Sequence, residues 1–297
     1  MMGISMKIWN EASDKLKALK NQGRTEEHRN IEPELLFPLD YLTYGDKNSY
    51  FISCMVKNYP EKKWMNSKEI VQKYPAFENL PEDYVGNVSY DAGNVKVKNA
   101  LNGFRILSET NGADLRYNSE VTSFDKSSIT LTDGTTFTGR NVVICCGPFT
   151  IDKFDKNYTN VKVIPTETIN FGGDLSDLPG IFYESSEKYS IYSLRDKHDF
   201  SCQKFGIHGE KDTDLTMEWA KERIPSKVKE IIGIDACFYT VTEGHEFIYK
   251  TNPDGVHYGY GLNGEGFKYM PAHGKIIYDG LITGDDTTYL KQLKAKI

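Results

Sequence analysis

The chain has 297 residues, of which 39% are hydrophobic and 26% charged, a composition typical of a soluble globular protein with one large core or two moderate ones. Aspartate and glutamate (42) outnumber lysine and arginine (36), and the net charge of −6, without any basic run, argues against a nucleic-acid or anionic-membrane partner. No apolar stretch is long enough to span a membrane, and the first residues turn polar too early for a signal peptide, so we expect neither.

Three helices are predicted in the first third of the chain. The first has Ser5 as its N-cap, carries apolar residues at helical spacing and stops at Gly23. These apolar residues are Ile8, Trp9, Ala12, Leu16 and Leu19. A short helix over 67–74 and an amphipathic helix over 95–110 follow. An amphipathic helix must cover its apolar face, so we expect both amphipathic helices to pack against other elements.

A series of short strands is predicted next. The strands span 113–117, 120–125, 128–132, 135–139 and 141–147. Asp133-Gly134 is a strong hairpin turn signal between two of them. A helix, a small β-meander and an apolar strand that ends in glycine are typical of how two-part flavoproteins complete a nucleotide domain. A generic α/β core would show the same pattern.

The remainder of the chain alternates strands and helices. Strands are predicted over 161–171, 181–185, 190–194, 203–208, 236–242, 246–250 and 256–261. Helical turns are predicted over 219–225 and 226–233, and a last helix begins at Pro271 and runs to residue 284.

Gly259-x-Gly261-x-x-Gly264 matches the dinucleotide fingerprint letter for letter. A working fingerprint needs a strand, a glycine turn, a helix and then a second parallel strand with an acidic residue about 20 positions on. Asp285 and Asp286 lie near that offset, but the residues after them do not read as a buried strand. The nucleotide interpretation therefore fails.

The glycines instead indicate a strand-to-helix turn that allows close approach of an electron-rich group. Lys268 adds a positive charge at the same place. A glycine-rich turn with a solvated lysine is the alternative.

The five cysteines are odd in number and lack C-x-x-C spacing, so we expect neither a metal site nor a disulfide framework, and favour a reducing compartment. They are Cys54, Cys145, Cys146, Cys202 and Cys237. The final Ala295-Lys296-Ile297 is a small-basic-aliphatic tripeptide of the S-K-L type that the peroxisomal import receptor reads. A Lys-rich tail is the alternative, and the expected location is then cytoplasmic.

Several motifs in order carry a resemblance to a known family. They are Lys204-x-x-x-His208, Cys237-x-Tyr239-Thr240, Glu246-Phe247-Ile248 with Pro253, and Asn263-Gly264-Glu265-Gly266-Phe267-Lys268. Together they resemble the monomeric sarcosine oxidase, N-methyltryptophan oxidase and peroxisomal pipecolate/sarcosine oxidase family of D-amino-acid-oxidase-like flavoproteins. The resemblance runs from about residue 65 to the C-terminus and includes Gly147 at the end of a strand.

The resemblance implies an α/β (α+β) fold, in which an incomplete FAD-binding Rossmann-like domain is interleaved with an antiparallel-sheet substrate domain. The implied FAD-binding segments are 1–28, 86–150 and 243–297, and the implied substrate segments are 29–85 and 151–242. The implied reaction moves a hydride from the carbon beside the secondary amine of an N-alkyl amino acid, of sarcosine or pipecolate type, to the flavin of FAD. The imine hydrolyses, oxygen is reduced to hydrogen peroxide, and a monomer is implied.

Residue roles follow from the same resemblance. Lys268 would pair with the substrate carboxylate, and Tyr239 and Glu265 would line the same pocket. Lys204 would promote the reaction with oxygen by stabilising developing superoxide, and His208 would lie near the amine. Without the resemblance, residues 204–208 are a strand whose polar side chains face water.

FAD attachment would be covalent through Cys237, because a thiolate is a nucleophile toward the electron-poor edge of the flavin. A buried small hydrophobe is the usual alternative for a single cysteine. The other implied cofactor-binding residues are Val121, Gly147, Gly264, Gly266, Phe267 and Lys268.

The chain departs from the family pattern in several places. Family members begin with V-I-V-G-A-G-x-x-G, whereas this chain opens with a helix that resembles the one after that unit, so we expect the pyrophosphate cradle to be missing. Glu265 stands where the family has histidine, and it would disfavour a carboxylate substrate or partly neutralise Lys268. Lys250, Gly244 and the stretch 192–195 also differ from the pattern.

Three interpretations remain from the sequence. The chain is an amine oxidase represented by an incomplete gene model or fragment, a flavin-less pseudoenzyme or binding protein derived from the family, or a generic α/β protein with coincidental motifs. The retained Lys204, His208, Cys237 and Lys268 favour the first.

Overall fold

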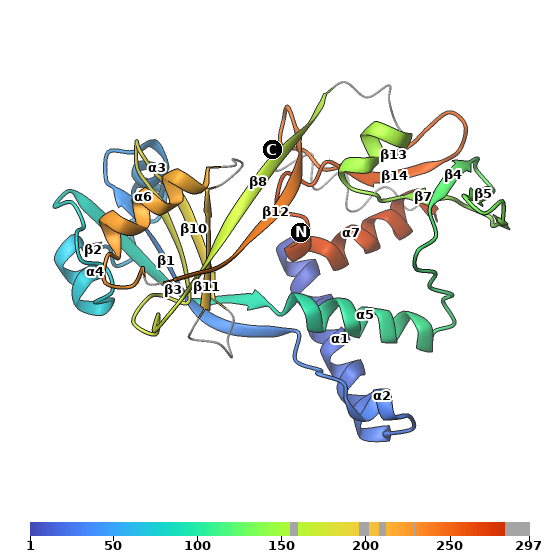
Figure 1. Cartoon of the computed structure of the whole chain (residues 1–297), viewed down its shortest axis with the longest axis horizontal. Coiled ribbons are helices and arrows are strands. Elements are labelled where there is room, and N and C mark those ends of the chain that lie inside the picture. Colours follow the sequence, from blue (N-terminus) through green and yellow to red (C-terminus); the bar gives the residue numbers. More distant parts are fainter. Residues whose placement is uncertain (155–159, 196–201, 208–211, 229, 283–297) are drawn as a thin grey trace. The chain divides into compact units, whose positions relative to one another are not determined.

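The structure is a computed structural model that describes the chain apart from residues 155–159, 196–201, 208–211, 229 and 283–297. The chain divides into two compact units, each assembled from segments far apart in sequence (Figure 1). Unit 1 comprises Met1–Leu35, Val97–Ile164 and Phe238–Ile297, and unit 2 comprises Leu36–Lys96 and Pro165–Cys237. Two strands, β8 (Val161–Gly172) and β12 (Glu230–Thr242), contribute residues to both units. The predicted mixed α/β class is confirmed.

Unit 2 is built on an eight-stranded sheet in the order β12-β8-β11-β10-β9-β1-β3-β2. The remaining strands are β1 (Leu36–Asp46), β2 (Met65–Asn66), β3 (Tyr84–Val95), β9 (Ile181–Ser185), β10 (Ser190–Arg195) and β11 (Cys202–Ile207). β1 pairs in parallel with β9, while β10 is antiparallel to β9 and β11, and β11 is antiparallel to β8. The sheet therefore combines strands from two segments that are far apart in the sequence.

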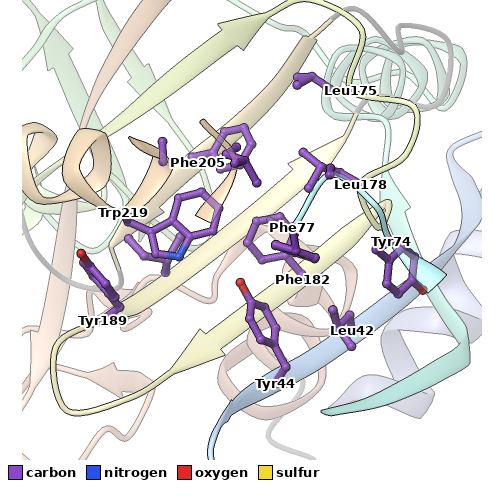
Figure 2. Close-up of a cluster of buried hydrophobic side chains, with 14 of the residues drawn as sticks. Leu42, Tyr44, Tyr74, Phe77, Leu175, Leu178, Phe182, Tyr189, Phe205 and Trp219 are labelled. Atoms are coloured by element: carbon purple, nitrogen blue, oxygen red, sulfur yellow. The ribbon is translucent and has the colours of Figure 1, made fainter. Parts of the chain in front are cut away.

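Aromatic side chains dominate the core of unit 2 (Figure 2). The Phe182 ring lies 5.5 Å from Trp219 and 5.8 Å from Phe205, centroid to centroid. Trp219 belongs to α6 (Thr213–Arg223), and the other helices of the unit are α3 (Tyr50–Asn58) and α4 (Ser67–Lys73). Large rings with edge and tilted contacts stabilise such a core beyond the apolar area that they bury.

Unit 1 combines helices with two small sheets. Its helices are α1 (Met2–Gln22), α2 (Glu26–Arg29), α5 (Val97–Thr110) and α7 (Met270–Ile276). One sheet is the meander β4 (Val121–Phe124), β5 (Ser128–Leu131) and β6 (Thr136–Thr138), and the other has the order β13-β14-β7. The strands of the second sheet are β13 (Ile248–Thr251), β14 (His257–Tyr260) and β7 (Val143–Ile144). Gly103 of α5 brings α5 close to α1, since a Cβ there would lie 2.6 Å from Leu16 Cδ1.

Most predicted elements are confirmed. Gly23 caps α1 in the left-handed conformation, with φ of 57°, and Gly134 takes a positive φ of 84° in the turn between β5 and β6. The helix expected from Pro271 begins at Met270 and continues as a π-helical turn over Ile277–Ile282. Residues 283 and 284 of that expected helix lie outside the described residues.

Three local predictions are wrong. Ser5 is not an N-cap, because α1 begins at Met2 and the Ser5 N–H donates to the Met1 carbonyl inside the helix. The segment 113–117 forms no strand, and Leu115 and Tyr117 are exposed. The segment 226–233 is not helical, because β12 begins at Glu230, where the β-branched Ile231 and Ile232 favour a strand.

Candidate functional site

The turn that opens with the predicted glycines is anchored by a buried asparagine in unit 1. Asn263 has a left-handed φ of 51°, and its side-chain oxygen accepts from the Thr242 N–H at 2.8 Å. Its amide donates to the carbonyls of Gly261 (3.0 Å) and Glu246 (3.3 Å). The turn is thereby tied to the end of β12, and the 263–268 backbone has a defined position in the unit.

Glycine is required in this turn because of what surrounds it. Gly264 has φ of 74°, and a Cβ there would lie 2.6 Å from the Tyr239 ring. A Cβ at Gly266 would lie 2.5 Å from the Leu262 side chain. The structure thus brings the predicted residues Tyr239 and Gly264 into direct contact.

Lys268 lies at the surface in the 3₁₀ turn η2 (Phe267–Tyr269) that leads into α7. Its Nζ donates to Glu265 Oε1 at 3.1 Å, and both side chains are nearly half exposed. Its carbonyl accepts from Trp9 Nε1 at 3.2 Å, and the Trp9 and Phe267 rings lie 6.2 Å apart. The backbone is held by α1 while the ammonium remains accessible.

A second glycine turn lies beside the first, at one edge of the β13-β14-β7 sheet. β7 and β14 are parallel neighbours, with Val143 opposite His257, so both strands end at one edge. Gly147 follows β7 with φ of 54°, and a Cβ there would meet nothing within 4 Å. In open α/β sheets, ligands bind outside the carboxyl ends of the strands, so this edge is a candidate ligand site. The predicted Val121 lies on β4, in the other sheet of the unit.

Cys237 lies on β12 and is exposed. Four large apolar side chains on the same strand, Ile231, Ile232, Ile234 and Phe238, are also 45–55% exposed. Exposed apolar residues that cluster on one element mark a surface that a ligand or partner covers.

Lys204 belongs to unit 2, on β11, where its Nζ forms an ion pair with Asp235 Oδ2 of β12 at 2.7 Å. Asn170 of β8 donates to the same oxygen at 3.1 Å. Lys204 and Asn170 hold the pKa of Asp235 below its ordinary value. The predicted His208 lies outside the described residues, as do Ala295-Lys296-Ile297.

Sequence reasoning missed a buried histidine close to the Lys268 turn. His273 of α7 is 7% exposed, and its Nδ1 shares a short hydrogen bond with the Tyr249 hydroxyl. The Phe247 ring packs against it edge-on at 4.9 Å. Burial lowers the pKa of His273 to about 4, so the imidazole is neutral at pH 7. A polar residue on the apolar face of the predicted helix was the available signal.

Sequence reasoning also missed a buried carboxylate in unit 2. Glu184 is fully buried, and its oxygens accept from Tyr44 (2.7 Å), Trp219 (2.7 Å) and Tyr84 (2.8 Å). Arg223 lies 3.4 Å away and supplies the positive charge. Burial raises the pKa of Tyr84 to about 12, so this tyrosine remains a hydrogen-bond donor. The cluster lies within the aromatic core and holds the fold.

Arg195 is the last residue of the stretch 192–195 that departs from the family pattern, and in this structure it has a structural role. Its guanidinium is buried and donates to Gln203 Oε1 at 3.2 Å and to the carbonyls of Leu175 and Leu178. Across the described ranges, His, Cys, Asp and Glu form no group that could hold a metal ion, and no helix there is long and apolar enough to cross a bilayer.

Comparison with known proteins gives a family match over most of the chain. The family model "FAD dependent oxidoreductase" matches residues 41–279. Monomeric sarcosine oxidase of Bacillus sp. (strain B-0618) is 22% identical over 249 residues, covering 74% of this chain and 63% of that protein. Peroxisomal sarcosine oxidase of Homo sapiens is 22% identical over 250 residues, covering 74% and 64%. The chain thus spans somewhat less than two thirds of the length of the curated relatives that it matches.

Solved structures share the fold. NikD, an unusual amino acid oxidase essential for nikkomycin biosynthesis, aligns with a TM-score of 0.74 at 19% identity, over 95% of this chain and 80% of that one. Glycine oxidase from Geobacillus kaustophilus aligns with a TM-score of 0.69 at 14% identity, over 92% and 77%.

Proposed function

The chain belongs to the family of FAD dependent oxidoreductases, and from that premise we propose that it binds FAD and oxidises a secondary amine. The proposed substrate is an N-alkyl amino acid of sarcosine or pipecolate type, which becomes an imine while oxygen is reduced to hydrogen peroxide. The observation that carries the proposal is the family match over residues 41–279. The sarcosine oxidase relatives point to the same substrate class.

The glycine turns of unit 1 support a place for part of a flavin nucleotide. The shared edge of β7 and β14 carries Gly147, whose missing side chain leaves open space, and the glycines 261 and 264 follow β14. We propose that Val121, Gly147, Gly264, Gly266, Phe267 and Lys268 contact the cofactor. The segments 1–28, 86–150 and 243–297 then serve FAD binding, and 29–85 and 151–242 serve the substrate.

The exposed β12 supports a place for the flavin ring. Cys237 offers an exposed thiol on β12, and Ile231, Ile232, Ile234 and Phe238 are exposed apolar side chains of the same strand. When bound, FAD supplies the acceptor for the hydride that leaves the carbon beside the amine. Cys237 is proposed as the point of covalent attachment.

The substrate contacts are proposed at the 263–268 turn. Lys268 would pair with the substrate carboxylate, with Tyr239 beside it. Glu265 already occupies the Lys268 ammonium at 3.1 Å, so a carboxylate substrate must displace it. Lys204 is proposed to stabilise charge that develops on oxygen, and His208 to lie near the amine.

We also propose that the protein acts as a monomer and enters peroxisomes through Ala295-Lys296-Ile297. The human relative is a peroxisomal sarcosine oxidase, which supports that location. Replacing Ile297 by Asp should abolish peroxisomal import of a tagged chain and leave it cytoplasmic.

The test is to express residues 1–297, record the visible spectrum and precipitate the protein with acid. A yellow protein with a yellow pellet, and bleaching when sarcosine or pipecolate is added without oxygen, are the expected results. A yellow protein with a colourless pellet would refute covalent attachment alone. A colourless protein would contradict FAD binding by this chain and leave two interpretations, a flavin-less protein derived from the family and a fragment of a longer oxidase.

A further inference from the structure

Polar side chains from three neighbouring strands of unit 2 contact one another around Asp235. Lys204 of β11 stands directly opposite Asn170 of β8, and β12, which carries Asp235, is the next strand in the sheet. Lys204 Nζ and Asn170 Nδ2 converge on the same oxygen, Asp235 Oδ2, at 2.7 Å and 3.1 Å. The Lys204 ammonium thus contacts Asp235 of β12, and Asn170 of β8 holds the same carboxylate oxygen.

The contact changes the charge that Lys204 presents. Asp235 accepts from a cation and an amide, and both stabilise its ionised form. An ammonium and a carboxylate 2.7 Å apart act on more distant groups as a dipole, whose effect falls with distance faster than that of a single charge. Partial exposure, 38% for Lys204 and 56% for Asp235, weakens the pair without removing it.

This compensation bears on the oxygen step. Reduction of oxygen to hydrogen peroxide takes two electrons and two protons, and the first electron creates the superoxide anion. The electrons come from the amine carbon through FAD when it is bound. A nearby uncompensated cation stabilises the developing anion, whereas an ion pair stabilises it less.

We infer that Asp235 is a positioning and charge-compensating residue for Lys204, which holds the reaction with oxygen below the rate that the lysine alone would support. The inference rests on the proposed function, in which Lys204 faces the oxygen step. It assigns to Asp235 a role in regulating that site, with Asn170 fixing the carboxylate.

The first experiment measures reoxidation by dissolved oxygen after the bound flavin has been reduced chemically, so that no amine substrate is needed. Asp235→Asn keeps the shape and a hydrogen-bond acceptor but removes the charge, and it should speed reoxidation by about twofold to fivefold, the range expected for a partly exposed pair. Asp235→Glu should restore the slow rate. Glu120→Gln, which breaks the exposed Lys153–Glu120 pair at 2.8 Å, is the matched control and should change nothing. An unchanged or slower rate in Asp235→Asn would overturn the inference.

The second experiment follows acylation of individual lysines by peptide mass spectrometry and requires neither flavin nor activity. An ammonium held by a carboxylate is a poor nucleophile, so Asp235→Asn should raise the acylation rate of Lys204 about threefold or more and leave Lys188 unchanged. Equal rates at Lys204 in both proteins would refute the ion pair and the inference with it. A protein without flavin would refute the proposed function and the oxygen step, while the acylation rates would still report the pair separately.

Discussion

Glu184 in unit 2 and Glu265 in unit 1 both meet a basic side chain, but they differ in their exposure to solvent. Glu184 has no exposed surface and accepts from Tyr44, Tyr84 and Trp219 in addition to facing Arg223. Glu265 is 43% exposed and its contact is Lys268. Removing one partner of a buried pair leaves an uncompensated charge in the core, whereas an exposed pair contributes little to stability.

The comparison separates two kinds of residue. Charges fully enclosed by donors hold the fold, and charges at the surface can exchange one partner for another. Lys268 and Lys204 are of the second kind, which is the property that a residue needs if it is to meet a substrate or oxygen. Four predictions test this division.

The largest effect is expected in the buried cluster. Glu184→Gln should lower the free energy of unfolding by about 3 kcal/mol, because Arg223 loses its buried counter-charge and keeps the partly exposed Glu222 at 3.4 Å. Chemical denaturation followed by tryptophan fluorescence would measure it. Glu218→Gln, at the exposed Lys188 pair, should cost under about 1 kcal/mol. Equal losses in the two variants would break the comparison.

His273 extends the comparison to pH. Burial lowers its pKa to about 4, below the ordinary value of about 6.5, so folding favours the neutral imidazole. The contribution of this pKa shift to the free energy of unfolding is complete above about pH 6.5. It is lost as the pH falls toward 4, and the loss amounts to about 2–3 kcal/mol. Unfolding free energies measured between pH 7 and pH 4 should therefore fall less steeply in His273→Asn. A slope that matches the parent protein would contradict the burial argument.

At the exposed turn, the expected effect is on binding instead of stability. Lys268→Gln should raise KM for an N-alkyl amino acid about tenfold, corresponding to roughly 1.4 kcal/mol, the low end for a charge-assisted hydrogen bond. Steady-state kinetics gives the value, and thermal melting serves as the control, since the melting temperature should hardly change. A large fall in the melting temperature would instead make Lys268 a structural residue.

The smallest effect is expected at Glu265. Glu265→Gln removes the carboxylate that competes for the Lys268 ammonium, so KM for a carboxylate substrate should fall about twofold to threefold. The same kinetic assay decides it. A rise in KM would show that Glu265 assists binding, and the interpretation of the pair as a competitor would be wrong.

Helix caps and tight turns could be predicted from the sequence, because they depend on a few neighbouring residues. Gly23 caps a helix and Gly134 lies in a hairpin turn because the left-handed backbone costs glycine little. The segment 226–233 was misassigned because helical and strand patterns overlap in short apolar runs, and β12 gains its conformation from its sheet neighbour. β1 and β3 were missed because each depends on its pairing, β1 with β9 far along the chain and β3 with β1 and β2.

The residues of the candidate site also fall into two groups, those that a sequence motif indicates and those that only the structure reveals. The family motifs identify Cys237, Lys204 and Lys268 from the sequence, because order and spacing carry the signal. Asp235 and His273 stand in no motif, and their importance comes from contacts that exist only in the folded chain. The sequence therefore indicates which side chains are functional candidates, while the structure reports the partners that tune them.

The hydrogen bond from Trp9 to the carbonyl of Lys268 has a consequence for biosynthesis. Trp9 and Lys268 are 259 positions apart, and β1 can form its parallel pair only after β9 has been synthesised. Such long-range contacts delay folding, because loops must close before the contacts can stabilise the chain. A ribosome would release most of the chain before either unit could close, and α1 would meanwhile need protection of its apolar face, so the nascent chain is expected to depend on chaperones until the last turn has emerged.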